Sequence, residues 1–206
     1  MSAAEPSGLN SLATLRRFAR PRPKVERCEL CSLELTPEHR HLLELSSCQL
    51  VCCCHGCFLL FSDQPGTRYR QVPRRIQALP DFRMTDAQWE SLLIPINMAF
   101  FCQHSATSRV VALYPSPAGA TESLLPLPAW QELLAGNPVL QEMQPDVEAL
   151  LVNRVGDARE HYLVSIDECY KLVGLIRAHW RGFSGGEEAW EQIAQFFARL
   201  KEQGDA

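Results

Sequence analysis

Cys28-Glu-Leu-Cys31 and Cys54-His-Gly-Cys57 are the two segments that decide the fold of this 206-residue chain. Each segment is a CxxC motif, and the intervening residues 32–53 have a length typical of four-cysteine zinc modules. Each motif brings two sulfurs to one cation at about 2.3 Å, and four thiolates complete a tetrahedral shell without an open position. We therefore predict a closed metal site formed by Cys28, Cys31, Cys54 and Cys57.

The sequence around these motifs predicts a small module that spans residues 25–63. Between the motifs, residues 39–45 and 48–53 are expected to form two strands joined by a short turn. Two CxxC motifs with a hairpin between them are typical of a zinc-ribbon or treble-clef module. The apolar run Phe58-Leu-Leu-Phe61 is expected to cover the module, because a segment of about 35 residues cannot build a sufficient core alone.

Further potential ligands lie close to the predicted site, and the sequence leaves their role open. Cys52 stands two residues before Cys54, but only Cys54 has CxxC spacing with Cys57. His39 and His41 share one face of their strand because they are two residues apart. They are either additional ligands or acid-base groups of an open site, or polar residues of a half-exposed hairpin. We favour the last interpretation.

Zinc is the metal that this pattern favours, and iron is the alternative, since four thiolates bind either metal. Rubredoxin-like iron sites, which transfer electrons, usually place Pro and Gly around their cysteines. Here Ser32 and Phe58 follow the second cysteine of each motif, and His55 occupies the position of the proline. These departures favour zinc.

A metal-dependent nuclease of the HNH type is a further alternative. Such an enzyme combines paired cysteines with an acidic-His element, here Glu38-His39, and would use His39 and His41. The histidine expected in its following helix is missing, since Phe58 follows Cys57. The sequence therefore favours a protein without catalytic activity.

The composition predicts a folded protein, which we expect in the cytoplasm. The chain has 46% hydrophobic and 21% charged residues, and seven of its nine cysteines lie between Cys28 and Cys57. Clustered cysteines without an export signal indicate metal binding in a reducing compartment. No apolar run approaches the roughly 20 residues that a membrane span needs. The excess of basic residues in the first part of the chain is too weak to favour nucleic acid as a partner.

Changes in composition along the chain predict four parts. Residues 1–24 are expected to form a flexible arm, and residues 25–63 the cysteine-rich metal-binding module. Residues 64–80 form a predicted connector, and residues 81–206 an α+β domain. The connector is basic and contains Arg68, Arg70, Arg74 and Arg75.

The α+β domain is predicted to have two layers, with two C-terminal helices covering a mixed sheet. Thr85-x-x-Gln88 and Ser165-x-x-Glu168 are capping-box signatures, each of which predicts the start of a helix. The clearest strand signal is a hairpin around Gly156. The expected strands lie at residues 96–101, 109–114, 123–127, 147–155 and 160–166. The expected helices lie after Thr85, at residues 129–134, after Ser165 and around residues 190–200.

Several strings in this chain resemble those of an uncharacterised bacterial family of unknown function. They are the paired CxxC motifs, Tyr114-Pro-Ser-Pro-Ala-Gly-Ala-Thr-Glu-Ser123, Ile166-Asp-Glu-Cys-Tyr170 and Trp180-Arg-Gly-Phe-Ser-Gly-Gly186. Genes of that family often lie beside nickel-iron hydrogenase genes, which implies an accessory, assembly or electron-transfer role. With no convincing catalytic group in residues 81–206, we expect a non-catalytic zinc-binding accessory protein. Its partner would be a nickel-iron hydrogenase or one of its maturation factors.

Overall fold

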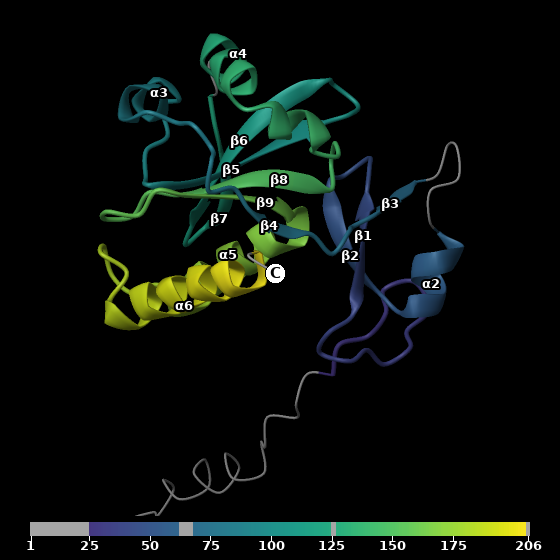
Figure 1. Cartoon of the computed structure of the whole chain (residues 1–206). Coiled ribbons are helices and arrows are strands. Elements are labelled where there is room, and N and C mark those ends of the chain that lie inside the picture. The colour runs from purple at the N-terminus through teal and green to yellow at the C-terminus, as the bar shows by residue number, and fades with distance from the viewer. Residues whose placement is uncertain (1–24, 62–67, 125–126, 205–206) are drawn as a thin grey trace, which may run out of the picture.

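The computed structural model of this protein describes residues 25–61, 68–124 and 127–204 (Figure 1). The flexible arm predicted for residues 1–24 lies outside these residues. The strands are β1 (Arg40–Glu44), β2 (Gln49–Cys53), β3 (Tyr69–Gln71), β4 (Ile76–Ala78), β5 (Met98–His104), β6 (Arg109–Ser116), β7 (Gly119–Ser123), β8 (Glu148–Asn153) and β9 (Glu160–Ser165). The helices are α2 (His55–Leu60), α3 (Asp86–Ser91), α4 (Leu127–Gly136), the 3-10 helix η1 (Pro138–Glu142), α5 (Ile166–His179) and α6 (Glu187–Gly204).

The described strands form two sheets. A three-stranded sheet has the order β2-β1-β3, and a six-stranded sheet has the order β4-β9-β8-β5-β6-β7. All the pairings within these two sheets are antiparallel. The α+β class is therefore confirmed, while the mixed sheet is corrected to an antiparallel one. Most neighbouring strands also follow one another in the chain, and a short connection between such strands produces antiparallel pairing.

The six-stranded sheet is covered on both faces, so the larger domain has three layers rather than the predicted two (Figure 1). In β5, Met98, Phe100 and Cys102 pack in the apolar cluster that includes α5 and α6. Ala99 and Phe101 pack in the opposite cluster, with α3, α4 and η1. Successive residues of a strand point to opposite faces. The continuous apolar run of β5 is thus the signature of a strand buried on both sides.

The two predicted capping boxes have different outcomes. Thr85 forms the complete capping box with Gln88 at the start of α3. Ser165 is the N-cap of α5, but its side chain makes no capping hydrogen bond and instead donates to Asp167 Oδ1 at 2.6 Å. Glu168 is buried and accepts hydrogen bonds from Lys171 and Arg199 instead of capping the helix. Tertiary ion pairs therefore replace the second box.

The three-stranded sheet lies between the cysteine motifs and the larger domain. Leu42 packs with the cysteines in a small apolar cluster, whereas the next residue, Leu43, packs with Val72 in the cluster of α5 and α6. The two faces of β1 therefore belong to different cores. In the run expected to cover the module, only Phe58 is buried, and Leu60 is 73% exposed. The larger domain covers the other face of β1, where Leu43 lies.

Two short strands occupy the described part of the predicted connector, residues 68–80. β3 pairs with β1, and β4 pairs with β9, so this segment belongs to both sheets. Three of its four arginines form ion pairs that hold the module, the connector and the domain together. The pairs are Arg68–Glu44, Arg70–Asp146 and Arg75–Glu148. The boundaries of independently folding units stay a prediction.

Candidate metal centre

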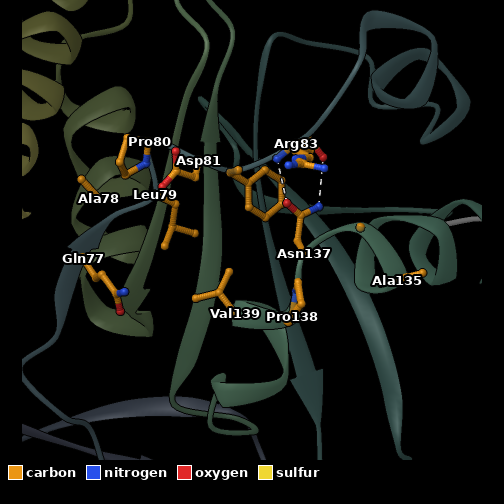
Figure 2. Close-up of a pocket in the computed structure, with 12 residues that line it drawn as sticks. Gln77, Ala78, Leu79, Pro80, Asp81, Arg83, Ala135, Asn137, Pro138 and Val139 are labelled. Atoms are coloured by element: carbon orange, nitrogen blue, oxygen red, sulfur yellow. Dashed lines mark hydrogen bonds between the residues drawn. The ribbon is translucent and has the colours of Figure 1, made fainter.

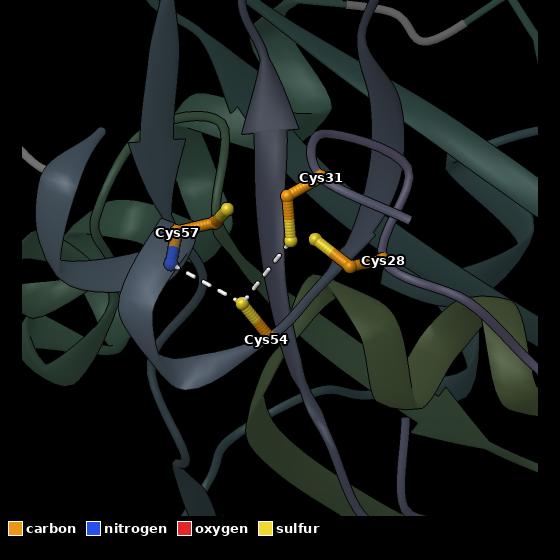
Figure 3. A group of neighbouring side chains, drawn as sticks. All are labelled: Cys28, Cys31, Cys54 and Cys57. Carbon is orange, nitrogen blue, oxygen red and sulfur yellow. Dashed lines mark hydrogen bonds between the residues drawn. The ribbon is translucent and has the colours of Figure 1, made fainter. Parts of the chain in front are cut away.

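The sulfur atoms of Cys28, Cys31, Cys54 and Cys57 face one point (Figure 3). They lie within 4.8 Å of one another, and the Sγ atoms of Cys31 and Cys54 are 3.7 Å apart. All four are free thiols rather than partners in disulfide bonds. The structure thus brings together the four residues that the CxxC motifs select.

Two backbone turns place these sulfurs. In the first, the carbonyl of Cys28 accepts a hydrogen bond from the N–H of Ser32 at 2.7 Å, and Ser32 has a left-handed φ of 64°. In the second, Cys54 is the N-cap of α2, and its Sγ accepts a hydrogen bond from the N–H of Cys57 at 3.4 Å. The β1–β2 hairpin reverses the chain between the motifs, so the two turns meet.

The spacing and chemistry of the four thiols fit a tetrahedral cation. Four tetrahedral bonds of about 2.3 Å separate each pair of sulfurs by about 3.8 Å. The distance between the Sγ atoms of Cys31 and Cys54 is close to this value. Thiolates select soft and borderline metals, such as zinc and iron. The cluster is therefore suited to a metal ion, and its geometry does not distinguish these two metals.

The surroundings of Cys28 and Cys57 give these two thiols unequal acidities. Burial opposes ionisation of Cys28, but the backbone N–H groups of Cys54 and Cys31 outweigh it and lower its pKa to about 6. Burial and the neighbouring sulfurs raise the pKa of Cys57 well above its ordinary value. In the chain without a metal, ionising one sulfur therefore makes the others harder to ionise. A bound cation would remove this conflict and displace the remaining protons.

Two other cysteines of the module lie outside the four-sulfur cluster, one of them buried and the other half-buried. Cys53 is fully buried, and its thiol donates to the carbonyl of Arg40 at 3.3 Å. Burial raises its pKa to about 12. Cys48 lies in the turn between β1 and β2 with a positive φ of 54°. Burial also raises its pKa.

A second group of potential ligands consists of His39, His41 and Cys52. One ligand atom from each lies within 4.8 Å of the other two. His39 Nδ1 lies 3.0 Å from the carbonyl oxygen of Thr36, and His41 Nδ1 lies 2.9 Å from Asp167 Oδ2. The two histidine side chains are only 8% and 17% exposed. They are more buried than the half-exposed hairpin predicts.

Asp167 contacts this group through His41, and it was not identified from the sequence as part of a site. It lies 126 residues after His41 in the chain, so no local pattern connects them. Burial opposes ionisation, but hydrogen bonds with His41 and Ser165 hold the pKa of Asp167 below its ordinary value. The ionised carboxylate therefore accepts a hydrogen bond from His41 Nδ1–H. The position of Cys52 opposite His41, in contrast, could be predicted from the sequence, because it follows from the register of the predicted hairpin.

A cavity of about 650 Å³ lies between residues 77–83 and 135–139 (Figure 2). Asn137 joins its walls, since its side chain accepts from the N–H of Arg83 at 2.7 Å and donates to the carbonyl of Arg83 at 2.9 Å. Asp81 and Arg83 are the charged residues among those that line it, and no histidine, cysteine or lysine does so. Among these lining residues, the Asp81 carboxylate is the group of a kind that acid-base or nucleophilic catalysis uses.

The fold and the clustered thiols define an α+β protein with a four-cysteine site suited to a metal. The chain belongs to DUF5947, a family of unknown function whose profile matches residues 27–204. This match agrees with the resemblance to an uncharacterised family. No curated protein and no solved structure matches the chain. In residues 25–61, 68–124 and 127–204, no helix is long and apolar enough to cross a membrane.

Proposed function

We propose that Cys28, Cys31, Cys54 and Cys57 bind one zinc ion, and that the protein is an accessory factor acting through protein contact rather than catalysis. The observation that carries this proposal is the cluster of four sulfurs within 4.8 Å of one another. Four thiolates fill the coordination shell of zinc and leave no position for a substrate. The role of such a centre is to stabilise a surface.

The small core of the module supports a structural role for the metal. Its buried residues are Cys28, Leu42, Cys53, Cys57 and Phe58, and two of these are proposed ligands. So few apolar side chains cannot hold a folded segment of this size. Because the unfolded chain has no preformed site, the free energy of zinc binding contributes directly to folding of the module.

Iron at the same cysteines would make the protein an electron carrier. Metal analysis and the visible spectrum of the purified chain separate the two metals, since zinc thiolate is colourless and ferric thiolate is red. We expect a colourless protein with zinc. Serine at Cys28 or Cys57 should lower the zinc content sharply, and serine at Cys48 should not. A red, iron-loaded protein would replace the accessory role with electron transfer.

The partner that family resemblance implies is a nickel-iron hydrogenase, its precursor or a maturation factor. Support for this partner comes from the gene neighbourhood of the resembling family, together with the closed coordination of the proposed zinc site. The protein would act in assembly or stabilisation, and we place it in the cytoplasm with these factors. This role requires an effect on hydrogenase protein rather than on hydrogenase expression.

Gene deletion in an organism that encodes both proteins tests the partner. We expect less assembled hydrogenase and lower hydrogenase activity, with normal hydrogenase transcript. The wild-type gene and Cys48→Ser should restore activity, and Cys28→Ser should not. Full activity in the deletion strain would refute the hydrogenase role and leave zinc binding to be judged from the purified protein.

A further inference from the structure

His39, His41 and Cys52 have the composition of a metal site distinct from the four-cysteine centre. We propose that these residues bind a second divalent ion, with zinc the best fit, and that the fourth coordination position is open to water or a small anion. This site does not depend on the zinc assignment at the four cysteines or on a hydrogenase partner.

The β1–β2 hairpin builds this site by strand geometry. His41 and Cys52 are directly opposed across the two strands, so their side chains point to the same face. His39 precedes His41 by two residues, and their rings lie 4.8 Å apart between centroids. Leu42 and Cys53 point to the opposite face, into the core of the four-cysteine module. One hairpin therefore separates two potential metal sites.

Hydrogen bonds orient both histidines as they do in known metal sites. The carbonyl oxygen of Thr36 can only accept, so His39 donates its Nδ1–H. The Asp167 carboxylate likewise accepts from His41 Nδ1. In each ring, Nε2 then keeps the lone pair that a metal needs. Carboxylates and carbonyls that hold the other ring nitrogen are a regular feature around metal-binding histidines.

His39 Nε2 supplies an independent sign of a missing ligand. The side chain of His39 is 92% buried, because only 8% of its surface is exposed. Its Nε2 atom is buried and has no hydrogen-bond partner. Buried polar atoms in folded proteins nearly always have a partner, so an orphaned acceptor beside a second imidazole and a thiol needs an explanation. A metal ion bound at Nε2 provides one.

The ligand set indicates which metal fits the site and that one coordination position stays open. Two imidazoles and one thiolate suit zinc, and zinc sites with three protein ligands hold water or substrate in the fourth position. The same set also occurs with copper, which the test below includes. Unlike the four-cysteine cluster, this group has no fourth protein ligand among the described residues within the same 4.8 Å. The fourth position is therefore left to a small molecule.

A cavity lies against two of the three proposed ligands. Its volume is about 460 Å³, and His39 and His41 line it together with residues of α5, α6 and the connector. Four of the lining side chains are cationic and three are acidic. The cations are Arg74, Arg75, Lys171 and Arg199, and the acids are Glu38, Asp167 and Glu168. Lys171 and Arg199 pair with Glu168. Glu26 lies 3.6 Å from His39 Nδ1. Burial, together with Glu29 and Glu26, raises the pKa of Cys52, so charges of both signs surround the group.

Metal titration of the purified full chain tests the proposal. We expect two zinc ions per wild-type chain, and one per chain for His39→Ala, His41→Ala and Cys52→Ser. His55→Ala and Cys48→Ser are the matched controls, since these residues lie in the same module outside the group, and both should keep two ions. A single zinc ion in the wild type, or two in all three variants, overturns the site. Preferential loading with copper, at the same stoichiometry, overturns the choice of zinc.

Asp167→Asn tests the site without removing a ligand, so it remains informative if a ligand variant fails to fold. Asp167 is a positioning residue, so its replacement should weaken binding of the second ion by about 10–100-fold. Affinity at the four-cysteine centre should stay unchanged, which a general loss of folding would not produce. Equal weakening at both sites, or no change at either, contradicts the role of Asp167 and the geometry proposed for the site.

Cobalt substitution with azide as an anion probe tests the open position. Cobalt in the second site should change its visible spectrum when azide binds, whereas cobalt in a closed four-thiolate site should not. Cys52→Ser should abolish the azide-sensitive part of the spectrum. If two cobalt ions bind and azide changes nothing, the second site is closed and the proposed open position is wrong.

Discussion

The module of residues 25–61 buries five residues in its own core, three of them cysteines, whereas the six-stranded sheet lies between two apolar clusters. In the module, thiols occupy positions where a larger protein would place leucine or phenylalanine. The domain is held by apolar burial, which needs no ligand. The two parts should therefore respond differently to loss of metal, loss of apolar volume and change of pH.

Loss of zinc is expected to have the largest effect, and to act on the module alone. Apparent binding free energies of structural zinc are about 10–16 kcal/mol in small zinc modules. Chelation, or Cys57→Ser, should abolish hydrogen-exchange protection in α2 and the Cys28 turn. Protection in β8 and β5, the two central strands of the six-stranded sheet, should persist. Loss of protection in both parts at once would show that the comparison between them is wrong.

Loss of apolar volume in the domain should give the opposite result. Phe100 is fully buried in β5, and Phe100→Ala should lower the free energy of unfolding by about 3–5 kcal/mol. Zinc content should not change. Leu60→Ser is the control, because Leu60 is exposed and its replacement should change stability by no more than about 0.5 kcal/mol. Thermal unfolding together with metal analysis measures both quantities.

Acid should destabilise the domain through His161. This residue is buried, and burial with the nearby charge of Arg154 lowers its pKa to about 4. The unfolded chain has a histidine pKa of about 6.5, so it binds more protons than the folded chain between these values. Stability therefore falls as pH decreases from about 6.5 to 4, by up to ~3 kcal/mol.

His161→Gln removes this titration. The difference in unfolding free energy between wild type and His161→Gln should change across that pH range in favour of the variant at low pH. Taking the difference cancels the separate effect of acid on the cysteine centre. A difference that does not vary with pH would contradict the neutral, buried state of His161.

Loss of the Arg70–Asp146 ion pair between the two parts should have the smallest of the four predicted effects on stability. Arg70 in β3 donates to the buried carboxylate of Asp146 at 2.6 Å. Arg70→Met leaves that carboxylate without this partner and should cost about 1–3 kcal/mol. Arg74→Met is the matched control, since Arg74 is exposed and forms none of the ion pairs described for the connector. Equal unfolding midpoints for the two variants would show that this ion pair does not join module and domain.

Local patterns predicted much of the fold correctly. The hairpin on either side of Gly156, the Thr85 capping box and the two C-terminal helices all form near the expected residues. Each depends on side chains that are close in sequence, such as a turn residue or a cap. The second capping box failed because Glu168 has two tertiary partners that no local pattern contains.

The four cysteines were selected by sequence alone, because CxxC spacing is a local requirement for placing two sulfurs on one ion. Tertiary structure decided the rest. Packing of α5 against the module brought Asp167 to His41. Tertiary packing also covers both faces of the six-stranded sheet and places three of the connector arginines in ion pairs. These arrangements depend on contacts between residues far apart in the chain, which no spacing rule within one segment can specify.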